Sequence, residues 1–176
     1  MRRPAALASA ALACAGATAG AADYLPEIPY PFANQQEFWI NSQPLADRDL
    51  AGRVVLVMFW SYGCHNCRNS LAWINDLHER RGSNRNLAII GVHTPEFESE
   101  KDKQALRDQV GRLGLEFPVM IDNDFLFWNA LGNRWWPAFY IADRQGQLRG
   151  SYFGEVHSGT DRARRIEALI GGLLSP

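Results

Sequence analysis

Two cysteines stand three residues apart, directly after a run of apolar residues. The stretch from Met58 to Leu71 reads MFWSYGCHNCRNSL, and it places Cys64 and Cys67 at the end of that run. A pair with this spacing can form a redox-active disulfide, hold a metal ion or act as a structural crosslink. The surrounding sequence decides between these three kinds of site.

The local structure expected around the pair favours redox chemistry. A buried strand is expected to end before Cys64 and a helix to begin there, so free backbone N–H groups and the helix dipole favour its thiolate. Cys67 follows one turn later, and Cβ atoms at that spacing lie about 5 to 6 Å apart, slightly more than a disulfide prefers. We therefore expect Cys64, the more exposed cysteine, to attack a partner disulfide and Cys67 to resolve the mixed disulfide.

His65 and Asn66 stand between the two cysteines. A protonated His65 would favour the neighbouring thiolate, because imidazole can carry a positive charge near neutral pH. We assign both residues a role in tuning the reactivity of the pair, without a direct part in proton transfer.

A metal site at the pair needs further ligands. Structural zinc usually takes four ligands, and the sequence has no second cysteine pair. A Cu(I) site stays open, since thiolates suit this ion, and its third ligand would be His65, His93 or His157. Haem attachment is excluded because Arg68 follows the second cysteine where histidine is required. A structural crosslink is a weak alternative, because closing so short a loop constrains the unfolded chain little.

The first 22 residues have the pattern of a secretory signal peptide. Arg2 and Arg3 precede an uncharged run, and Ala19 and Ala21 form an A-x-A pattern ahead of the expected cleavage site. The run contains mostly small residues, so retention as a membrane anchor is the weaker alternative. Cleavage would remove Cys14 and leave the other two cysteines alone in a periplasmic or otherwise exported, oxidising compartment.

Chain length and charge restrict the classes of partner. The 176 residues suffice for one domain with its own hydrophobic core. Nineteen acidic and 18 basic residues leave a net charge of −1, so no whole-molecule field attracts nucleic acid or an anionic membrane. Partners must therefore be recognised by a local site.

Apolar patterning predicts alternating strands and helices. The continuous run over 53–60 predicts a strand buried on both faces. Apolar residues at helical spacing over 66–81 predict a helix that ends at Gly82. Further strands are expected at 87–92 and 117–122, separated by a second helix. This order predicts an α/β fold with a parallel core.

The rest of the chain completes the predicted sheet. A short helix capped by Asn123 or Asp124 is expected first, then a β-hairpin and a closing helix over 159–174. The hairpin makes the central sheet mixed, with helices on both faces. Residues 23–44 are expected to be an extended lead-in, and 45–176 to be the folded domain.

Several separated blocks resemble one protein family. VVLVMFWSYGCHNC resembles the active-site strand and motif of thioredoxin-fold proteins, especially the exported TlpA/ResA type and the C-terminal domain of DipZ. The blocks LAIIGVHTPEFESEKD, VMIDNDFLFWNALGNRWWPAFYIADRQG and FGE extend the resemblance over roughly 45–176. It implies a thioredoxin-like fold and thiol-disulfide exchange, with the disulfide of Cys64 and Cys67 in place of any separate cofactor or metal.

The resemblance also implies roles for individual residues. Pro137 matches the family's cis-proline, so the bond from Trp136 is predicted cis, and the backbone there would bind a substrate strand. Trp60 matches the tryptophan before the motif and is a further substrate-binding candidate. Met58 stands where thioredoxin has a buried aspartate, so Glu96, at the place of a ResA-like glutamate, is the candidate to accept the resolving thiol's proton if partial burial raises its pKa.

Glu96 and His93, which belong to the same turn, can also be interpreted without a direct role in the reaction. Glu96 is alternatively a solvated loop charge, because glutamate is usually exposed. His93 is expected to be a packing or capping residue.

The leading functional hypothesis is an exported thiol-disulfide oxidoreductase that works as a reductant. Its partners would be protein thiols or disulfides and an upstream redox donor, membrane-bound or soluble, and the chain would act as a monomer. One alternative is a copper-handling thioredoxin-like chaperone that uses the same cysteines. Another is a redox-inactive thioredoxin-like adaptor, in which Cys64 would titrate as an ordinary thiol.

Overall fold

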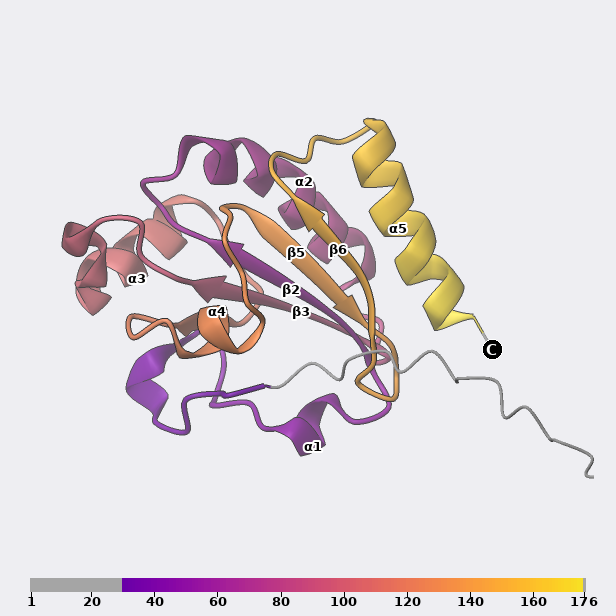
Figure 1. Cartoon of the computed structure of the whole chain (residues 1–176), viewed down its shortest axis with the longest axis horizontal. Coiled ribbons are helices and arrows are strands. Elements are labelled where there is room, and N and C mark those ends of the chain that lie inside the picture. Colours follow the sequence, from indigo (N-terminus) through magenta and orange to yellow (C-terminus); the bar gives the residue numbers. More distant parts are fainter. Residues whose placement is uncertain (1–29, 176) are drawn as a thin grey trace, which may run out of the picture.

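The computed structural model describes residues 30–175, which form a six-stranded sheet covered by helices (Figure 1). The signal peptide expected at 1–22 and the first part of the expected lead-in, 23–29, lie outside the described residues. The strands are β1 (Trp39–Ile40), β2 (Val54–Trp60), β3 (Leu87–His93), β4 (Val119–Ile121), β5 (Ala138–Ala142) and β6 (Leu148–Phe153). The α-helices are α1 (Asp47–Leu50), α2 (His65–Arg81), α3 (Lys103–Arg112), α4 (Leu126–Ala130) and α5 (Asp161–Leu174), and the 3-10 helices are η1 (Gln36–Phe38) and η2 (Glu98–Lys101).

The sheet is mixed, as the order of elements predicts. Its strand order is β1-β4-β3-β2-β5-β6, with β2, β3 and β4 parallel to one another. Strands β1, β5 and β6 each run antiparallel to a neighbour. The predicted hairpin is therefore confirmed as β5 and β6. No helix within 30–175 is long and apolar enough to cross a membrane.

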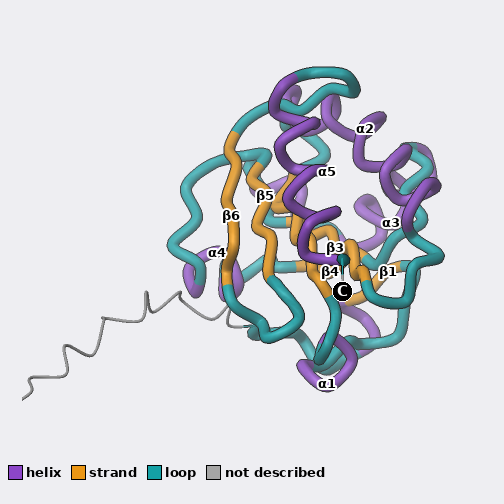
Figure 2. The backbone as a smooth tube through the Cα atoms, turned by 90° about the vertical axis from the view of Figure 1, so that its right-hand side faces the viewer, coloured by secondary structure: helices purple, strands orange, loops and turns teal. Residues whose placement is uncertain are grey.

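Strand β2 lies at the centre of the molecule, and its side chains alternate between two layers of core. Leu56 and Met58 pack with residues of α2, α3 and α5, whereas Val57 and Phe59 pack with residues of α1 and α4. Figure 2 shows α2 and α5 on one side of the sheet and α4 on the other. All seven residues of β2 are buried, so the strand gives Cys64 a rigid support.

Part of the segment expected to be an extended lead-in belongs to the sheet. Trp39 in β1 lies opposite Met120 of β4, and its side chain is buried. The sheet therefore begins ahead of the expected boundary at residue 45. The boundary shifts because the two apolar residues of β1 pair with β4 and form the edge strand of the sheet.

The cap of the short helix α4 differs from the sequence prediction of Asn123 or Asp124. The buried carboxylate of Asp122 accepts hydrogen bonds from the backbone N–H groups of Phe127 and Trp128, at 3.1 and 3.0 Å. Phe125 adopts a left-handed conformation with φ 58°, which turns the chain back over Asp122. Burial raises the pKa of Asp122, and the backbone hydrogen bonds oppose that rise.

Candidate active site

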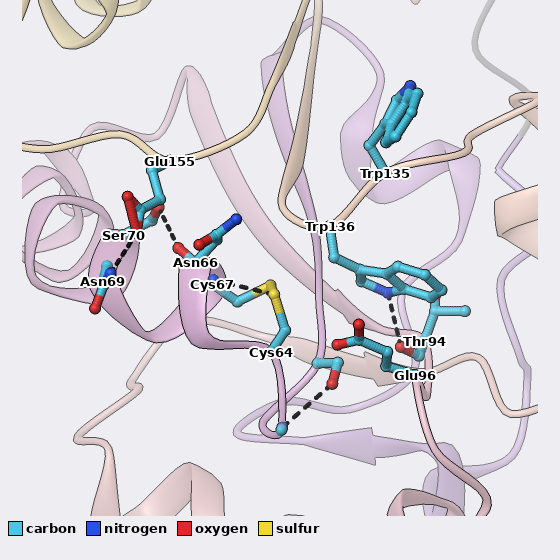
Figure 3. The surroundings of a disulfide bond; sticks show 12 residues. Cys64, Asn66, Cys67, Asn69, Ser70, Thr94, Glu96, Trp135, Trp136 and Glu155 are labelled. Atoms are coloured by element: carbon cyan, nitrogen blue, oxygen red, sulfur yellow. Dashed lines mark hydrogen bonds between the residues drawn. A yellow bond between two sulfur atoms is a disulfide. The ribbon is translucent and has the colours of Figure 1, made fainter.

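The two cysteines lie where β2 gives way to α2. Cys64 is the N-cap of α2, and its sulfur accepts a hydrogen bond from the backbone N–H of Cys67 at 3.2 Å. The two residues form a disulfide, with their Cα atoms 5.3 Å apart (Figure 3). Cys64 retains 7% of its surface exposed and Cys67 retains none. The prediction that Cys64 is the more accessible cysteine is therefore confirmed.

A shallow hollow opens at Cys64 and brings together side chains from three segments. The start of α2 contributes Cys64, His65 and Asn66, and the turn after β3 contributes Glu96. The loop before β5 contributes the rest of the lining, Arg134, Trp135 and Trp136. An extended segment of a partner placed here would meet the exposed side of the disulfide.

The loop beside the hollow has the predicted cis bond between Trp136 and Pro137. The Trp136 indole N–H donates to the backbone carbonyl of Thr94 at 3.0 Å. The centroids of the Trp136 and Trp128 rings lie 4.1 Å apart. Trp135 is 61% exposed, and its ring points away from the disulfide (Figure 3). The Trp136 ring is thus held in place, while Trp135 offers a free apolar surface.

Trp60 does not reach the hollow, although the sequence suggested a substrate-binding role. Its side chain is fully buried in the core and contacts the ring of His93 edge-on. A residue of β2 that faces α2 contributes to packing and does not meet a partner protein.

Glu96 lines the hollow with Cys64, but its side chain is exposed. The partial burial expected for Glu96 is therefore not found. In Figure 3 the Glu96 carboxylate is drawn on the side of the residue that faces Cys64, so the expected part of Glu96 in proton transfer depends on proximity.

A second glutamate, which the sequence does not single out, is Glu100 in η2, buried at 2% exposure. Its carboxylate accepts hydrogen bonds from the Ser61 hydroxyl at 2.6 Å and from the backbone N–H of Gly63 at 2.7 Å. A third donor is the backbone N–H of Glu96 at 2.8 Å. Glutamates alternate at positions 96, 98 and 100, and nothing in that pattern indicates which one turns inward.

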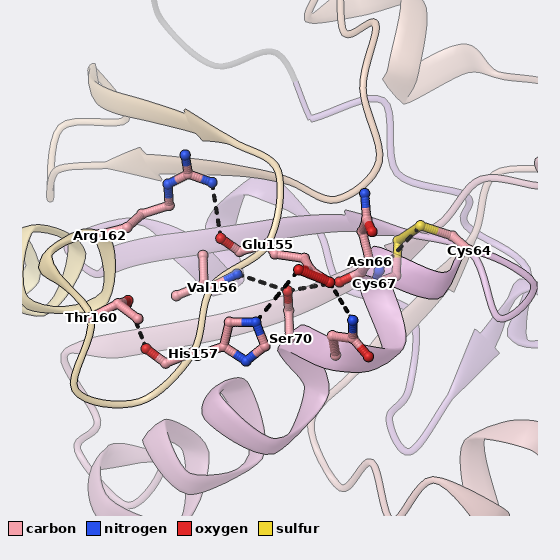
Figure 4. Close-up of polar contacts among 10 residues, drawn as sticks. Cys64, Asn66, Cys67, Ser70, Glu155, Val156, His157, Thr160 and Arg162 are labelled. Atoms are coloured by element: carbon pink, nitrogen blue, oxygen red, sulfur yellow. Dashed lines mark hydrogen bonds and ion pairs between the residues drawn. A yellow bond between two sulfur atoms is a disulfide. The ribbon is translucent and has the colours of Figure 1, made fainter.

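A third carboxylate, Glu155 in the loop after β6, lies against the first turns of α2 (Figure 4). It accepts a hydrogen bond from the Asn69 side chain and lies 3.5 Å from the ring of His157. The pKa of Glu155 is lowered, chiefly by the Asn69 hydrogen bond and also by His157 and the charge of His65. Because Asn69 and His65 both belong to α2, this loop supports the helix that bears the disulfide.

His93 at the end of β3 is confirmed as a packing residue. Its ring stacks on Tyr62 and contacts Trp60 edge-on. Neither ring nitrogen has a hydrogen-bond partner within the described part of the chain. Burial lowers the pKa of His93 from 6.5 to about 3, because the charged ring would lose its hydration.

This buried histidine predicts a loss of stability in mild acid. The unfolded chain binds a proton near pH 6.5 but the folded chain binds it only near pH 3, so the stabilising effect of neutral His93 is complete above pH 6.5 and declines as the pH falls towards 3. At pH 5 the loss amounts to about 2 kcal/mol. Urea unfolding at pH 7.5 and pH 5 measures this loss as a difference in the free energy of unfolding. In His93→Phe that difference should be smaller by the contribution of His93. An unchanged difference in the variant would contradict the assignment.

The copper alternative gains no support from the geometry. Within residues 30–175, no group of three or more histidine, cysteine, aspartate or glutamate side chains is placed to hold a metal ion. His93 is enclosed by aromatic rings and His157 pairs with Glu155.

The sequence pattern of the AhpC/TSA family matches residues 30–151, which include both cysteines, Glu96 and Pro137. The chain belongs to the AhpC/TSA family. The family resemblance expected from the sequence is confirmed, and its match starts ahead of residue 45, in agreement with the place of β1 in the sheet.

Curated relatives of this AhpC/TSA chain include proteins of very different length. Protein DipZ of Mycobacterium tuberculosis is 36% identical over 120 residues, which cover 66% of this chain and 17% of DipZ. Thiol-disulfide oxidoreductase YkuV of Bacillus subtilis is 26% identical over 147 residues, which cover 84% of this chain and 95% of YkuV. The chain thus spans a small part of DipZ and nearly all of YkuV.

Solved structures confirm the thioredoxin-like fold of this AhpC/TSA chain. A thiol-disulfide isomerase from Corynebacterium glutamicum has a TM-score of 0.73 and 25% identity, with 88% of this chain and 99% of that chain covered. An oxidised thioredoxin-like protein has a TM-score of 0.70 and 24% identity, with 85% and 95% covered. On this thioredoxin-like fold, the Cys64–Cys67 disulfide lies at the start of α2.

Proposed function

We propose that this protein is exported and reduces disulfide bonds in partner proteins as a monomer. The observation that carries the proposal is the position of Cys64 at the N-terminus of α2, where it keeps 7% exposure beside a fully buried Cys67. Helix N-termini stabilise thiolates. The expected signal peptide supports export, and N-terminal sequencing of the mature protein should find a start near Asp23.

The exchange proceeds in two steps with balanced atoms and electrons. The Cys64 thiolate attacks one sulfur of the partner disulfide, forms a mixed disulfide and releases the first partner thiolate. The Cys67 thiolate then attacks the Cys64 sulfur, forms the Cys64–Cys67 disulfide and releases the second partner thiolate. Two electrons have passed to the partner, and a dithiol donor, membrane-bound or soluble, must supply two electrons to restore the pair.

The hollow around Cys64 supports a protein as the partner. Trp136, the residue before the cis bond, lines the hollow with Cys64, and its backbone is the candidate to pair with an extended strand of the partner. The exposed Trp135 ring adds apolar contact area. His65 and Asn66 line the same hollow and would tune the thiolate from there.

Two measurements test the proposed direction of electron flow. The reduced protein should accelerate the reduction of insulin by dithiothreitol. Equilibration with glutathione should give a reduction potential closer to about −270 mV, as in reductants, than to about −120 mV, as in strong oxidants. A potential near the oxidant value, with no acceleration of insulin reduction, would contradict the proposal.

Glu96 is the proposed acceptor of the Cys67 proton. Glu96→Gln keeps the size of the side chain and removes its basicity, so the rate of insulin reduction should fall about 100-fold. Glu98→Gln is a matched control, because Glu98 is exposed and pairs with Lys101. Equal rates for the two variants would show that Glu96 is a solvated loop charge.

A further inference from the structure

The buried carboxylate of Glu100 lies beside the loop that leads into Cys64, and exchange chemistry does not by itself require it. Burial of a carboxylate is costly unless hydrogen bonds compensate for the lost hydration. All three of its partners, Ser61, Gly63 and Glu96, are donors. The contacts therefore match an acceptor-only carboxylate.

These contacts join two segments that the proposed reaction needs. Ser61 and Gly63 belong to the loop between β2 and Cys64, whereas the backbone N–H of Glu96 belongs to the turn after β3. The hydroxyl of Tyr62 adds a fourth link, since it donates to the backbone carbonyl of Ser99 at 3.1 Å. Glu100 thus holds the residue before Cys64 and the backbone of Glu96 against one another.

The packing around Gly63 leaves no room for a side chain at this position. A Cβ atom at Gly63 would collide with the carboxylate oxygen of Glu100 that receives the Gly63 N–H. The close approach is possible because glycine has no side chain. The Gly63 N–H, directly before the N-cap residue Cys64, donates to Glu100 at 2.7 Å and also to the Ser61 hydroxyl oxygen at 3.2 Å.

We infer that Glu100 is a positioning residue for the nucleophile. Its carboxylate fixes the loop 61–63, and that loop sets the N-cap conformation in which the Cys64 sulfur faces the first turn of α2. The biological meaning of this inference rests on the proposed function. The experiment that tests the inference does not depend on that function. The role differs from proton transfer, because Glu100 is sealed from the hollow that Glu96 lines.

Glu100→Gln tests the inference with little change in volume. The carboxylate offers separate oxygens to the N–H groups of Gly63 and Glu96, whereas an amide has only one oxygen, so one of these two N–H groups loses its hydrogen bond to residue 100. The readout is the rate of Cys64 alkylation by iodoacetamide as a function of pH, in the reduced protein. The charged groups facing Cys64 across the hollow, His65, Glu96 and Arg134, are the same in both proteins.

The direction in which the pH midpoint of Cys64 alkylation shifts distinguishes a positioning role of Glu100 from a purely electrostatic effect of its charge. A loosened loop weakens the hold of the helix N-terminus on the thiolate, so the pH midpoint should rise and the rate at pH 7 should fall about threefold to tenfold. Loss of a nearby negative charge alone would favour the thiolate and lower the midpoint. A lowered midpoint, or one unchanged as in the Glu98→Gln control, would overturn the inference.

A second variant keeps the test decisive if Glu100→Gln does not fold. Ser61→Ala removes one of the three donors and leaves both backbone contacts, so it should raise the midpoint by less. Thermal unfolding monitored by circular dichroism confirms that each variant is folded at the assay temperature. Iodoacetamide needs no partner protein, so an insulin assay that fails for the wild type would count against the proposed function and leave the alkylation result valid.

Discussion

Cys64→Ser should reduce disulfide exchange to the uncatalysed rate, the largest functional loss expected for any single substitution in this protein. The hydroxyl that replaces the thiol is not a nucleophile towards disulfides at neutral pH, and Cys67 is fully buried and does not replace it. The loss should exceed about 10³-fold in the insulin assay.

The free energy of unfolding should change little in Cys64→Ser. A loss of activity in this variant therefore reports on the chemistry and not on folding. The disulfide closes a loop over a sequence separation of three, and short loops contribute little through the unfolded state. Ala72→Ser, at an exposed position of the same helix, is the matched control and should retain full activity. Residual exchange by Cys64→Ser well above background would show that another group carries the reaction.

Phe59→Ala should cause the largest loss of stability, about 3 to 5 kcal/mol. Phe59 is fully buried near the C-terminal end of β2, and its ring makes edge contacts with Phe127, Trp128 and Tyr140. Truncation leaves a cavity between the sheet and α4, and rigid neighbouring rings cannot close it. Urea unfolding at pH 7.5 measures the change.

Leu126→Ala provides the comparison for this core substitution. Leu126 lies in α4 like two of the contacting rings, but its side chain is 62% exposed. Its truncation should change the free energy of unfolding by no more than about 0.5 kcal/mol. Similar losses for the two variants would contradict the assignment of Phe59 to a rigid core.

The fold could be predicted from the sequence because its elements are marked by strong local patterns. The apolar run of β2 has no polar interruption, and the helix after the cysteines repeats its apolar residues with the helical period. Gly82 is the C-cap of α2, as predicted. The short strand β1 escaped prediction because its two residues become a strand only through pairing with β4.

The centre of the site could be predicted, but the residues that support it could not. The spacing of Cys64 and Cys67 is itself the chemical signal. The inward turn of Glu100 depends on the contact with Gly63, which is 37 residues away in the sequence. The burial of Trp60 agrees with the predicted burial of β2 on both faces, and only the family resemblance had suggested a substrate-binding role for it. Contacts between distant segments decide these details.

Trapping of a mixed disulfide tests the central claim most directly. Cys67→Ala, reduced and mixed with a disulfide-bonded protein such as insulin, should form a covalent adduct on Cys64 that dithiothreitol releases, because no second thiol remains to resolve it. Mass spectrometry of the proteolysed adduct should place the link at Cys64. Absence of any adduct under conditions in which the wild type reduces insulin would contradict the account.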